Sequence, residues 1–137
     1  MYIFINYFKI MTLITLSAIS FTFLTTIVII FQLCLVIGLP WGAAAMGGKF
    51  PGKFPPKMRV VAIFISILLF FTIIITLARA ELFFLQLFTF SKIAIWFVVV
   101  LYAIGTIMNI ITPSKIEKIW IPVAAIQLIT SFIIAIS

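Results

Sequence analysis

The sequence contains no histidine, only two acidic residues, Glu81 and Glu117, and a single cysteine, Cys34. The usual general bases and metal ligands are therefore nearly absent, which argues against side-chain catalysis and against a metal site. One cysteine excludes a disulfide or a cysteine cluster within the chain. We expect a protein that is not an enzyme and that has no cofactor.

Charge of either sign is scarce as well. Only 8% of the 137 residues are charged and 66% are hydrophobic, whereas a soluble domain has about 25% charged residues. This composition excludes a water-soluble fold. The expected surroundings are membrane lipids, and no nucleic-acid partner is expected.

Four apolar runs are each long enough to cross about 30 Å of hydrocarbon as a helix. They lie at about residues 10–37, 60–78, 93–111 and 118–136. They predict an all-α, polytopic integral membrane protein, in which residues 1–137 form a single domain built as a bundle of four transmembrane helices. A loop rich in glycine, proline and lysine, residues 38–59, joins the first two helices.

Local signals predict how the later helices begin and end. Residues 82–91 are apolar but interrupted by polar side chains, which suggests a short interfacial helix or a helical extension ending at Lys92. Pro113 stops the third helix. Ser114 and Glu117 have the spacing of a capping box at the start of the fourth helix, and Pro122 is expected to kink that helix.

The basic residues predict an orientation. Six of them fall in the two loops at one end, namely Lys49, Lys53, Lys57, Arg59, Lys115 and Lys118, and three fall at the other end, namely Lys9, Arg79 and Lys92. The positive-inside rule then places loops 38–59 and 112–118 in the cytoplasm and both termini outside the cell membrane. At the opposite end, Arg79 and Glu81 are expected to form an interfacial pair.

The loop 38–59 is the first candidate site, because basic residues near an anionic leaflet attract its headgroups. Its prolines argue against a helix, so we expect an extended or turning strip whose phenylalanines dip into the interface. The adjacent glycines suggest a weak anion nest of backbone N–H groups. The expected anion- or lipid-binding residues are Trp41, Gly47, Gly48, Lys49, Lys53, Lys57 and Arg59. The alternative is that these charges only fix the topology.

Polar residues inside the apolar runs form the second candidate site. Gln32, Ser66, Tyr102, Thr106, Asn109 and Gln127 fall at comparable depths when each helix is measured from the basic end, and depth places Gln127 opposite Tyr102. Such a polar layer serves either as interhelical hydrogen-bonding glue or as the lining of a cytoplasm-facing pocket. In the second case, the lysine-rich loop would form the mouth of the pocket and select an anionic or zwitterionic ligand.

Two functions follow from these features. The first is a non-enzymatic small integral membrane protein, an accessory or protective subunit for example, whose basic cytoplasmic loop binds anionic lipid or an acidic partner. The alternative is a small transporter or channel for an anionic or small polar solute, with the polar layer as its constriction. Since four helices rarely enclose a pathway alone, this alternative requires a homo-oligomer or a membrane-protein partner. A lipid-modifying enzyme is the least favoured, because titratable groups are so few.

Overall fold

The computed structural model describes all 137 residues as four long helices joined by short turns. They are α1 (Tyr2–Val36), α2 (Pro56–Arg79), α3 (Phe88–Ile111) and α4 (Trp120–Ile136). With the 3-10 turns that lead into α3 and α4, each is long and apolar enough to cross a membrane. The predicted fold class, a four-helix multi-pass membrane protein, is confirmed.

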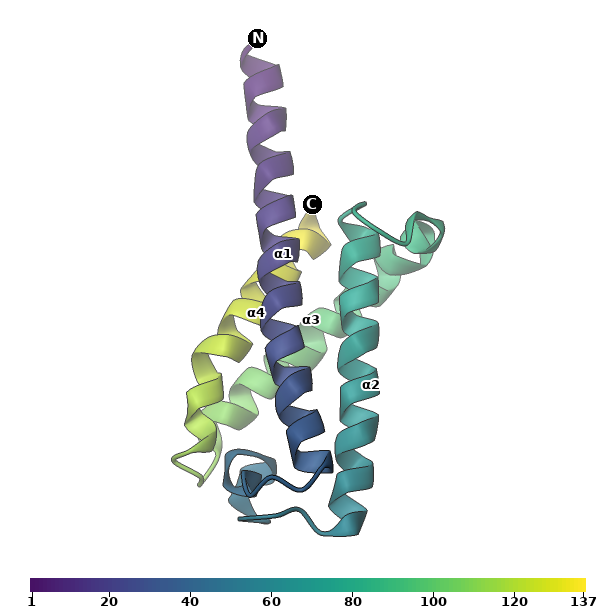
Figure 1. Ribbon diagram of the computed structural model, residues 1–137. Coiled ribbons are helices and arrows are strands. Elements are labelled where there is room, and N and C mark those ends of the chain that lie inside the picture. Colours follow the sequence, from purple (N-terminus) through teal and green to yellow (C-terminus); the bar gives the residue numbers. More distant parts are fainter.

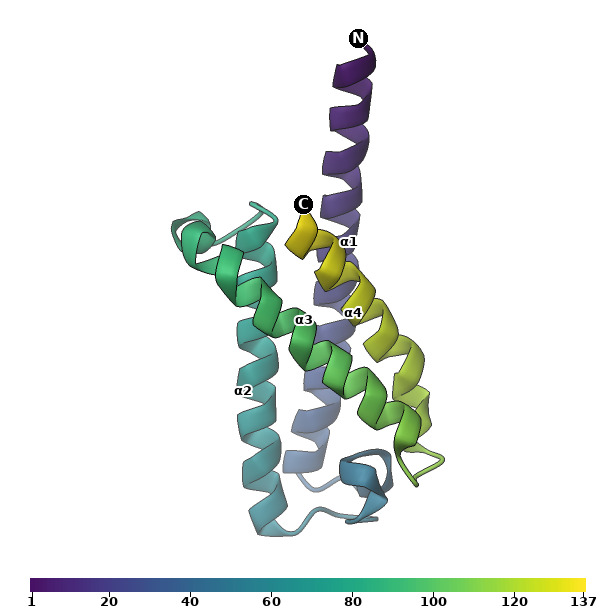
Figure 2. The same cartoon turned by 180° about the vertical axis from the view of Figure 1, so that it is seen from behind.

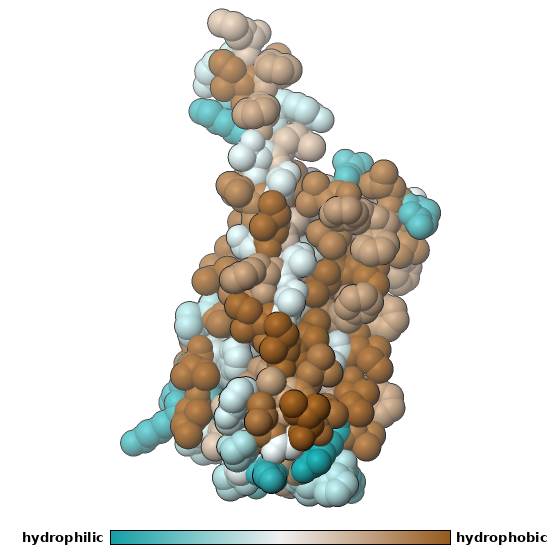
Figure 3. All heavy atoms as spheres, viewed as in Figure 1, coloured by the Kyte–Doolittle hydropathy of each residue, from teal (hydrophilic) through white to brown (hydrophobic).

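The four helices are arranged in a closed bundle in which neighbours in the chain are neighbours in space. Helices α1 and α3 each contact both α2 and α4 (Figures 1 and 2). Apolar side chains cover the flank of the bundle, and polar ones gather toward its ends (Figure 3). In water so much exposed apolar surface would be unfavourable, whereas in hydrocarbon it is solvated.

Helix α1 is longer than the sequence predicted. It begins at Tyr2 rather than near residue 10 and contains 35 residues, or about 52 Å. Residues 1–13 are exposed, and this segment projects beyond the rest of the bundle (Figure 1). No proline or glycine precedes Ile10, so nothing in this segment stops the helix from continuing through Lys9.

Helix α2 also begins earlier than predicted, at Pro56. Proline suits the first position of a helix, because the N–H that it lacks would have no intrahelical acceptor there. Lys57 and Arg59 therefore lie in the first turn of α2, and the loop proper ends at Pro55.

The segment 82–91, in the hairpin between α2 and α3, forms a helical extension, the second of its two expected arrangements. A 3-10 turn at Leu85–Leu87 runs directly into α3 at Phe88, and the helix continues past Lys92 instead of ending there. Glu81 and Phe84 adopt positive φ values of 59° and 57°, which turn the chain sharply enough for α3 to begin at once.

The charges at this hairpin also differ from the expected arrangement. Arg79 donates to the backbone oxygen of Ser137 instead of pairing with Glu81. Lys92 lies inside α3, with its Nζ 4.9 Å from the centre of the Phe88 ring. Both cations stay near this end of the bundle without forming the expected ion pair.

The start of α4 confirms one half of the capping box. The Glu117 N–H donates to Ser114 Oγ at 3.3 Å. The Ser114 N–H, however, donates to Thr112 Oγ1 at 3.2 Å, and that hydroxyl donates to Glu117 Oε2 at 2.6 Å. The Thr112 hydroxyl thus links the Ser114 N–H to the Glu117 carboxylate.

Pro122 lies in the first turn of α4, after a 3-10 segment at Glu117–Ile119. The change of helix type therefore comes in place of the expected kink.

Two apolar cores hold the bundle together. The larger is formed by Ala18, Phe21, Leu69, Ala80, Ile95, Val98, Tyr102, Ile134 and Ala135. The smaller contains Leu35, Ala45, Phe54 and Ala62. Because Phe54 is only 2% exposed, this loop side chain anchors the loop to α1 and α2 and does not dip into the membrane interface as predicted.

Candidate functional site

The loop 38–55 turns repeatedly and is folded, which is the turning alternative and not the extended one. It contains two 3-10 turns, Gly42–Ala44 and Met46–Gly48, at the end of the bundle opposite the N-terminus (Figure 1). The Gly42 N–H donates to Gly52 O at 2.9 Å. A side chain at position 42 would lie 1.9 Å from Phe50 O, so only glycine permits this close approach of two backbone segments.

The folded loop docks on the turn between α3 and α4. Ser114 Oγ donates to Ala43 O, and Trp120 Nε1 donates to Ala44 O at 3.0 Å. Gly48 lies against Ser114, since a Cβ added at Gly48 would be 2.9 Å from the Ser114 Cβ. Two segments about 70 residues apart in the sequence therefore form one cap over this end of the bundle, which we call the loop cap (residues 38–55 with 112–120).

Five lysines point outward from this end of the molecule. Lys49, Lys53, Lys57, Lys115 and Lys118 are all exposed. Arg59 is different, because its Nε donates to Phe54 O at 2.8 Å and its guanidinium lies against Gly38. Of the basic residues predicted to bind anions, Arg59 is therefore a structural residue that fixes the loop to α2.

The expected anion nest is not available at the two glycines. Gly47 and Gly48 do have positive φ values of 66° and 72°. The N–H groups of Gly48 and Lys49, however, already donate to the carbonyls of Ala45 and Met46. These backbone donors close the 3-10 turn, so they are not free for an anion.

Trp41 packs on the bundle while remaining 47% exposed. Its ring lies parallel to that of Phe31, with 6.4 Å between centroids, and Trp120 contacts the same Phe31 at 4.9 Å. This aromatic cluster joins α1, the loop and α4.

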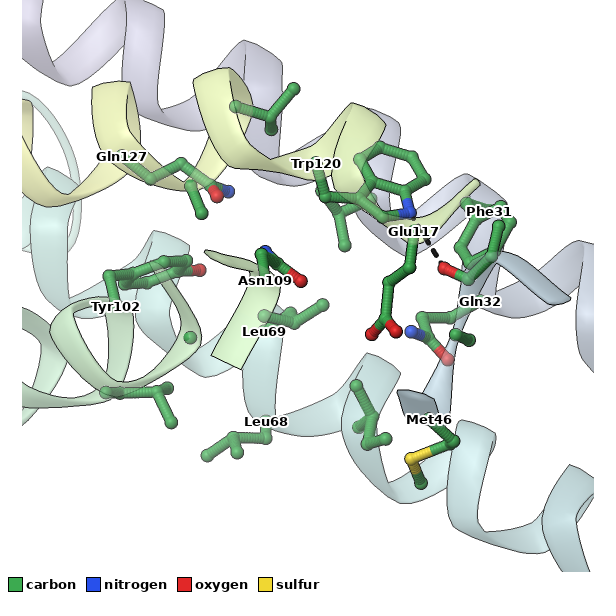
Figure 4. A pocket seen from close by; sticks show the side chains of 18 residues that line it. Phe31, Gln32, Met46, Leu68, Leu69, Tyr102, Asn109, Glu117, Trp120 and Gln127 are labelled. Atoms are coloured by element: carbon green, nitrogen blue, oxygen red, sulfur yellow. Dashed lines mark hydrogen bonds between the residues drawn. The ribbon is translucent and has the colours of Figure 1, made fainter. Parts of the chain in front are cut away.

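Beneath the loop cap lies a pocket of about 320 Å³ lined by all four helices and by the loop. Most of its wall is apolar, including Leu68, Leu69 and Met46 (Figure 4). Its polar lining consists of Gln32, Tyr102, Asn109, Glu117 and Gln127.

The pocket brings together four of the six residues of the predicted polar layer. Ser66 and Thr106 are not among its lining residues. Ser66 donates to Ala62 O at 2.9 Å and Thr106 donates to Tyr102 O at 2.7 Å, each within its own helix. Both hydroxyls thereby satisfy backbone carbonyls, as serine and threonine often do in membrane helices.

At the inner end of the pocket, the polar groups bond across helices. Gln127 Nε2 donates to Thr25 Oγ1 at 2.9 Å. Thr72 donates to Leu69 O, so the Tyr102 hydroxyl, 3.0 Å away, donates to Thr72 Oγ1. Gln127 and Tyr102 lie at the same end of the pocket (Figure 4), as depth along the helices predicted, but each is held by another helix. The polar groups at this end therefore also hold the helices together by hydrogen bonds, which is the other role considered for the polar layer.

The outer end of the pocket carries the group that sequence analysis missed. Glu117 is directed into the pocket and faces Gln32, with Asn109 nearby (Figure 4). The loop contributes Ala44, Ala45 and Met46 to the wall and no lysine. The loop lines the pocket, but its lysines do not, because it folds with its apolar side chains inward and its lysines outward. Capping spacing explained Glu117 at the sequence level, and only tertiary packing reveals that the carboxylate enters a pocket.

No group of three His, Cys, Asp or Glu side chains is close enough to hold a metal ion. No protein-family model, curated protein or solved structure matches this chain.

Proposed function

We propose that this chain is a non-enzymatic integral membrane protein whose basic end binds anionic headgroups, in the cytoplasmic leaflet if the positive-inside rule sets its orientation. The observation that supports this proposal is the set of five exposed lysines on the loop cap and the first turn of α2. The one acidic residue at this end, Glu117, bonds to Thr112 and faces the pocket, so it does not neutralise that surface.

The expected strength of the attraction to anionic lipid follows from the number of lysines. Each lysine near an anionic leaflet contributes about 1 kcal/mol, so five give a surface that enriches anionic lipid around the protein. The loop cap is already ordered by Ser114, Trp120 and Phe54. Binding therefore need not order a flexible loop, a step that normally reduces affinity. An acidic surface on a partner membrane protein is the other occupant that such charges suit.

Lipid-specific quenching of tryptophan fluorescence tests this proposal. A Trp96→Phe background leaves tryptophan only at positions 41 and 120, both at the basic end. The protein is reconstituted into symmetric phosphatidylcholine vesicles in which a minority lipid, brominated phosphatidylserine or brominated phosphatidylcholine, acts as quencher. Because both leaflets are alike, orientation does not affect the result.

We expect stronger quenching by the brominated phosphatidylserine, and we expect the excess to vanish when all five lysines are changed to glutamine. It should also disappear at about 1 M salt, where charges are screened within about 3 Å. The matched control changes Lys9 and Lys92, at the other end, to glutamine and should retain the excess. Equal quenching by both lipids in the parent protein at low salt contradicts the proposal.

The transporter alternative is supported by one observation, the pocket formed by the polar layer. Within one chain, a pathway would have to continue past the Gln127–Thr25 and Tyr102–Thr72 bonds and through the larger core. A solute flux that Gln127→Leu abolishes in reconstituted vesicles would favour transport over lipid binding.

A further inference from the structure

We propose that the pocket binds an amphiphile with an ammonium headgroup, whose hydrocarbon chain leaves the pocket between α2 and α3. This inference concerns a different part of the molecule from the lysine surface. It depends on the lining of the pocket, on the groove that adjoins it and on the unmatched polar groups inside it.

The pocket adjoins an apolar groove. A second cavity of about 250 Å³ lies between α2 and α3 and shares Leu68 and Leu101 with the pocket. Two of its other lining residues, Phe71 and Phe97, are 54% and 75% exposed, so the groove opens on the flank of the bundle. Toward the loop cap, α3 diverges from α2 (Figure 2). A chain from the bilayer could lie in this groove with its polar end in the pocket.

The polar end of the pocket holds hydrogen-bonding groups that have no partner in the protein. Glu117 uses Oε2 to accept from Thr112, and its other oxygen has no hydrogen bond from the protein. The amide side chains of Gln32 and Asn109 line the same region and also form no hydrogen bond with the protein. The free carboxylate oxygen can only accept, so it requires a donor from the ligand, whereas the two amides can either donate or accept.

The charge and the aromatic rings of the pocket wall favour a cationic donor on the ligand. Glu117 is the only acidic or basic side chain that lines the pocket, so an anionic head would meet a like charge in an apolar setting. Phe31 and Trp120 stand at the same end as Glu117 (Figure 4), and their ring centroids are 4.9 Å apart. Aromatic faces beside a carboxylate attract ammonium groups through cation–π interactions and charge-assisted hydrogen bonds.

Gly105 provides a way to close this site without disturbing the fold. It lines the pocket from α3, and a Cβ added there would have no neighbour within 4 Å. A phenylalanine at this position would extend into the cavity instead of clashing with backbone. Gly105→Phe should therefore fill the site while the bundle remains assembled.

Native mass spectrometry of the full chain in a nonionic detergent tests the proposal with three ligands of equal chain length: dodecylamine, dodecanol and dodecyl sulfate. We expect one dodecylamine per chain, bound at least about tenfold more tightly than the other two, as one charge-assisted contact gives. Glu117→Gln keeps an oxygen that can accept from Thr112 but lacks the charge, and it should lose this preference. Glu81→Gln, which changes the only other acidic side chain, should retain it, and Gly105→Phe should exclude the amine.

Dodecyl sulfate that binds as tightly as the amine and is excluded by Gly105→Phe would overturn the proposal, as would unchanged amine binding by Glu117→Gln; sulfate binding that Gly105→Phe leaves intact belongs to the lysines and is not counted. If Glu117→Gln fails to fold, Gly105→Phe decides, since amine binding by that variant at wild-type affinity would refute the pocket as the site. Displacement of dodecylamine by phosphatidylethanolamine would support the proposal and identify a membrane lipid as the source of the ammonium. Its failure to displace a specifically bound amine would support a free amine instead. Neither result depends on the five lysines, so this test and that of the lysine surface can fail independently.

Discussion

Replacing Gly42 by alanine should release the loop cap. The residue does not require glycine for its own φ value, because it is not among the positive-φ positions. It requires glycine because an added Cβ would lie 1.9 Å from Phe50 O and 2.7 Å from Gly52 O. Both are backbone atoms, so no side-chain rotation relieves the contact, and the segment around residues 50–52 must move by about 1 Å or more.

The size of the effect follows from what that movement disrupts. The hydrogen bond from Gly42 to Gly52 and the two side-chain bonds onto Ala43 and Ala44 contribute about 1 kcal/mol each. Loosening of Phe54 adds a part of the about 2 kcal/mol that its burial provides. We therefore expect Gly42→Ala to lower the free energy of unfolding by about 3 kcal/mol.

Two measurements check this prediction. Unfolding in mixed micelles of nonionic detergent and dodecyl sulfate gives the stability, and limited trypsin digestion gives the accessibility of Lys49 and Lys53 in the loop. The matched control is Gly105→Ala, which meets no neighbour and should be neutral or stabilising by about 0.5–1 kcal/mol, because glycine in a helix is costly. If Gly42→Ala matches this control in both assays, the tight crossing of the loop does not exist.

Three further substitutions test other contacts by the same unfolding assay. Phe54→Ala should cost about 3–5 kcal/mol, because the ring is buried between α1, α2 and the loop, whereas the less buried Phe50 should cost clearly less; equal losses would contradict the smaller core. Tyr102→Phe should cost about 1 kcal/mol, since it removes the donor to Thr72, and no change would mean that this bond is absent. Thr112→Val should cost about 1–2 kcal/mol, because the hydroxyl both accepts a backbone N–H and donates to a carboxylate; Thr112→Ser should restore most of this loss.

Helix ends were predicted less well than helix number. The predicted helix starts at about residues 10, 60 and 93 lie later than the observed starts at Tyr2, Pro56 and Phe88. A single lysine near a membrane surface extends its flexible stem and does not stop a helix, and Pro56 starts α2 instead of excluding it. Ser114 was interpreted correctly because its cap is a local contact that spans only three residues.

The candidate site shows the same division between local and long-range information. Depth along the helices was sufficient to place Gln32, Tyr102, Asn109 and Gln127 around one region. It could not show the partners of Tyr102 and Gln127, because those bonds depend on how each helix rotates about its own axis. Nor could it show that Ser66 and Thr106 bond within their own helices instead of lining the pocket.

By itself the sequence determined that this is a four-helix membrane protein with its charge concentrated at one end, because hydrocarbon requires long uncharged helices with satisfied backbones. It also determined which two segments lie at that end. Only the tertiary structure decided that these segments interlock through Ser114 and Trp120, that their lysines face outward, and that Glu117 enters the pocket. Those features depend on contacts across about 70 residues of chain, and no local pattern specifies which groups such contacts will bring together.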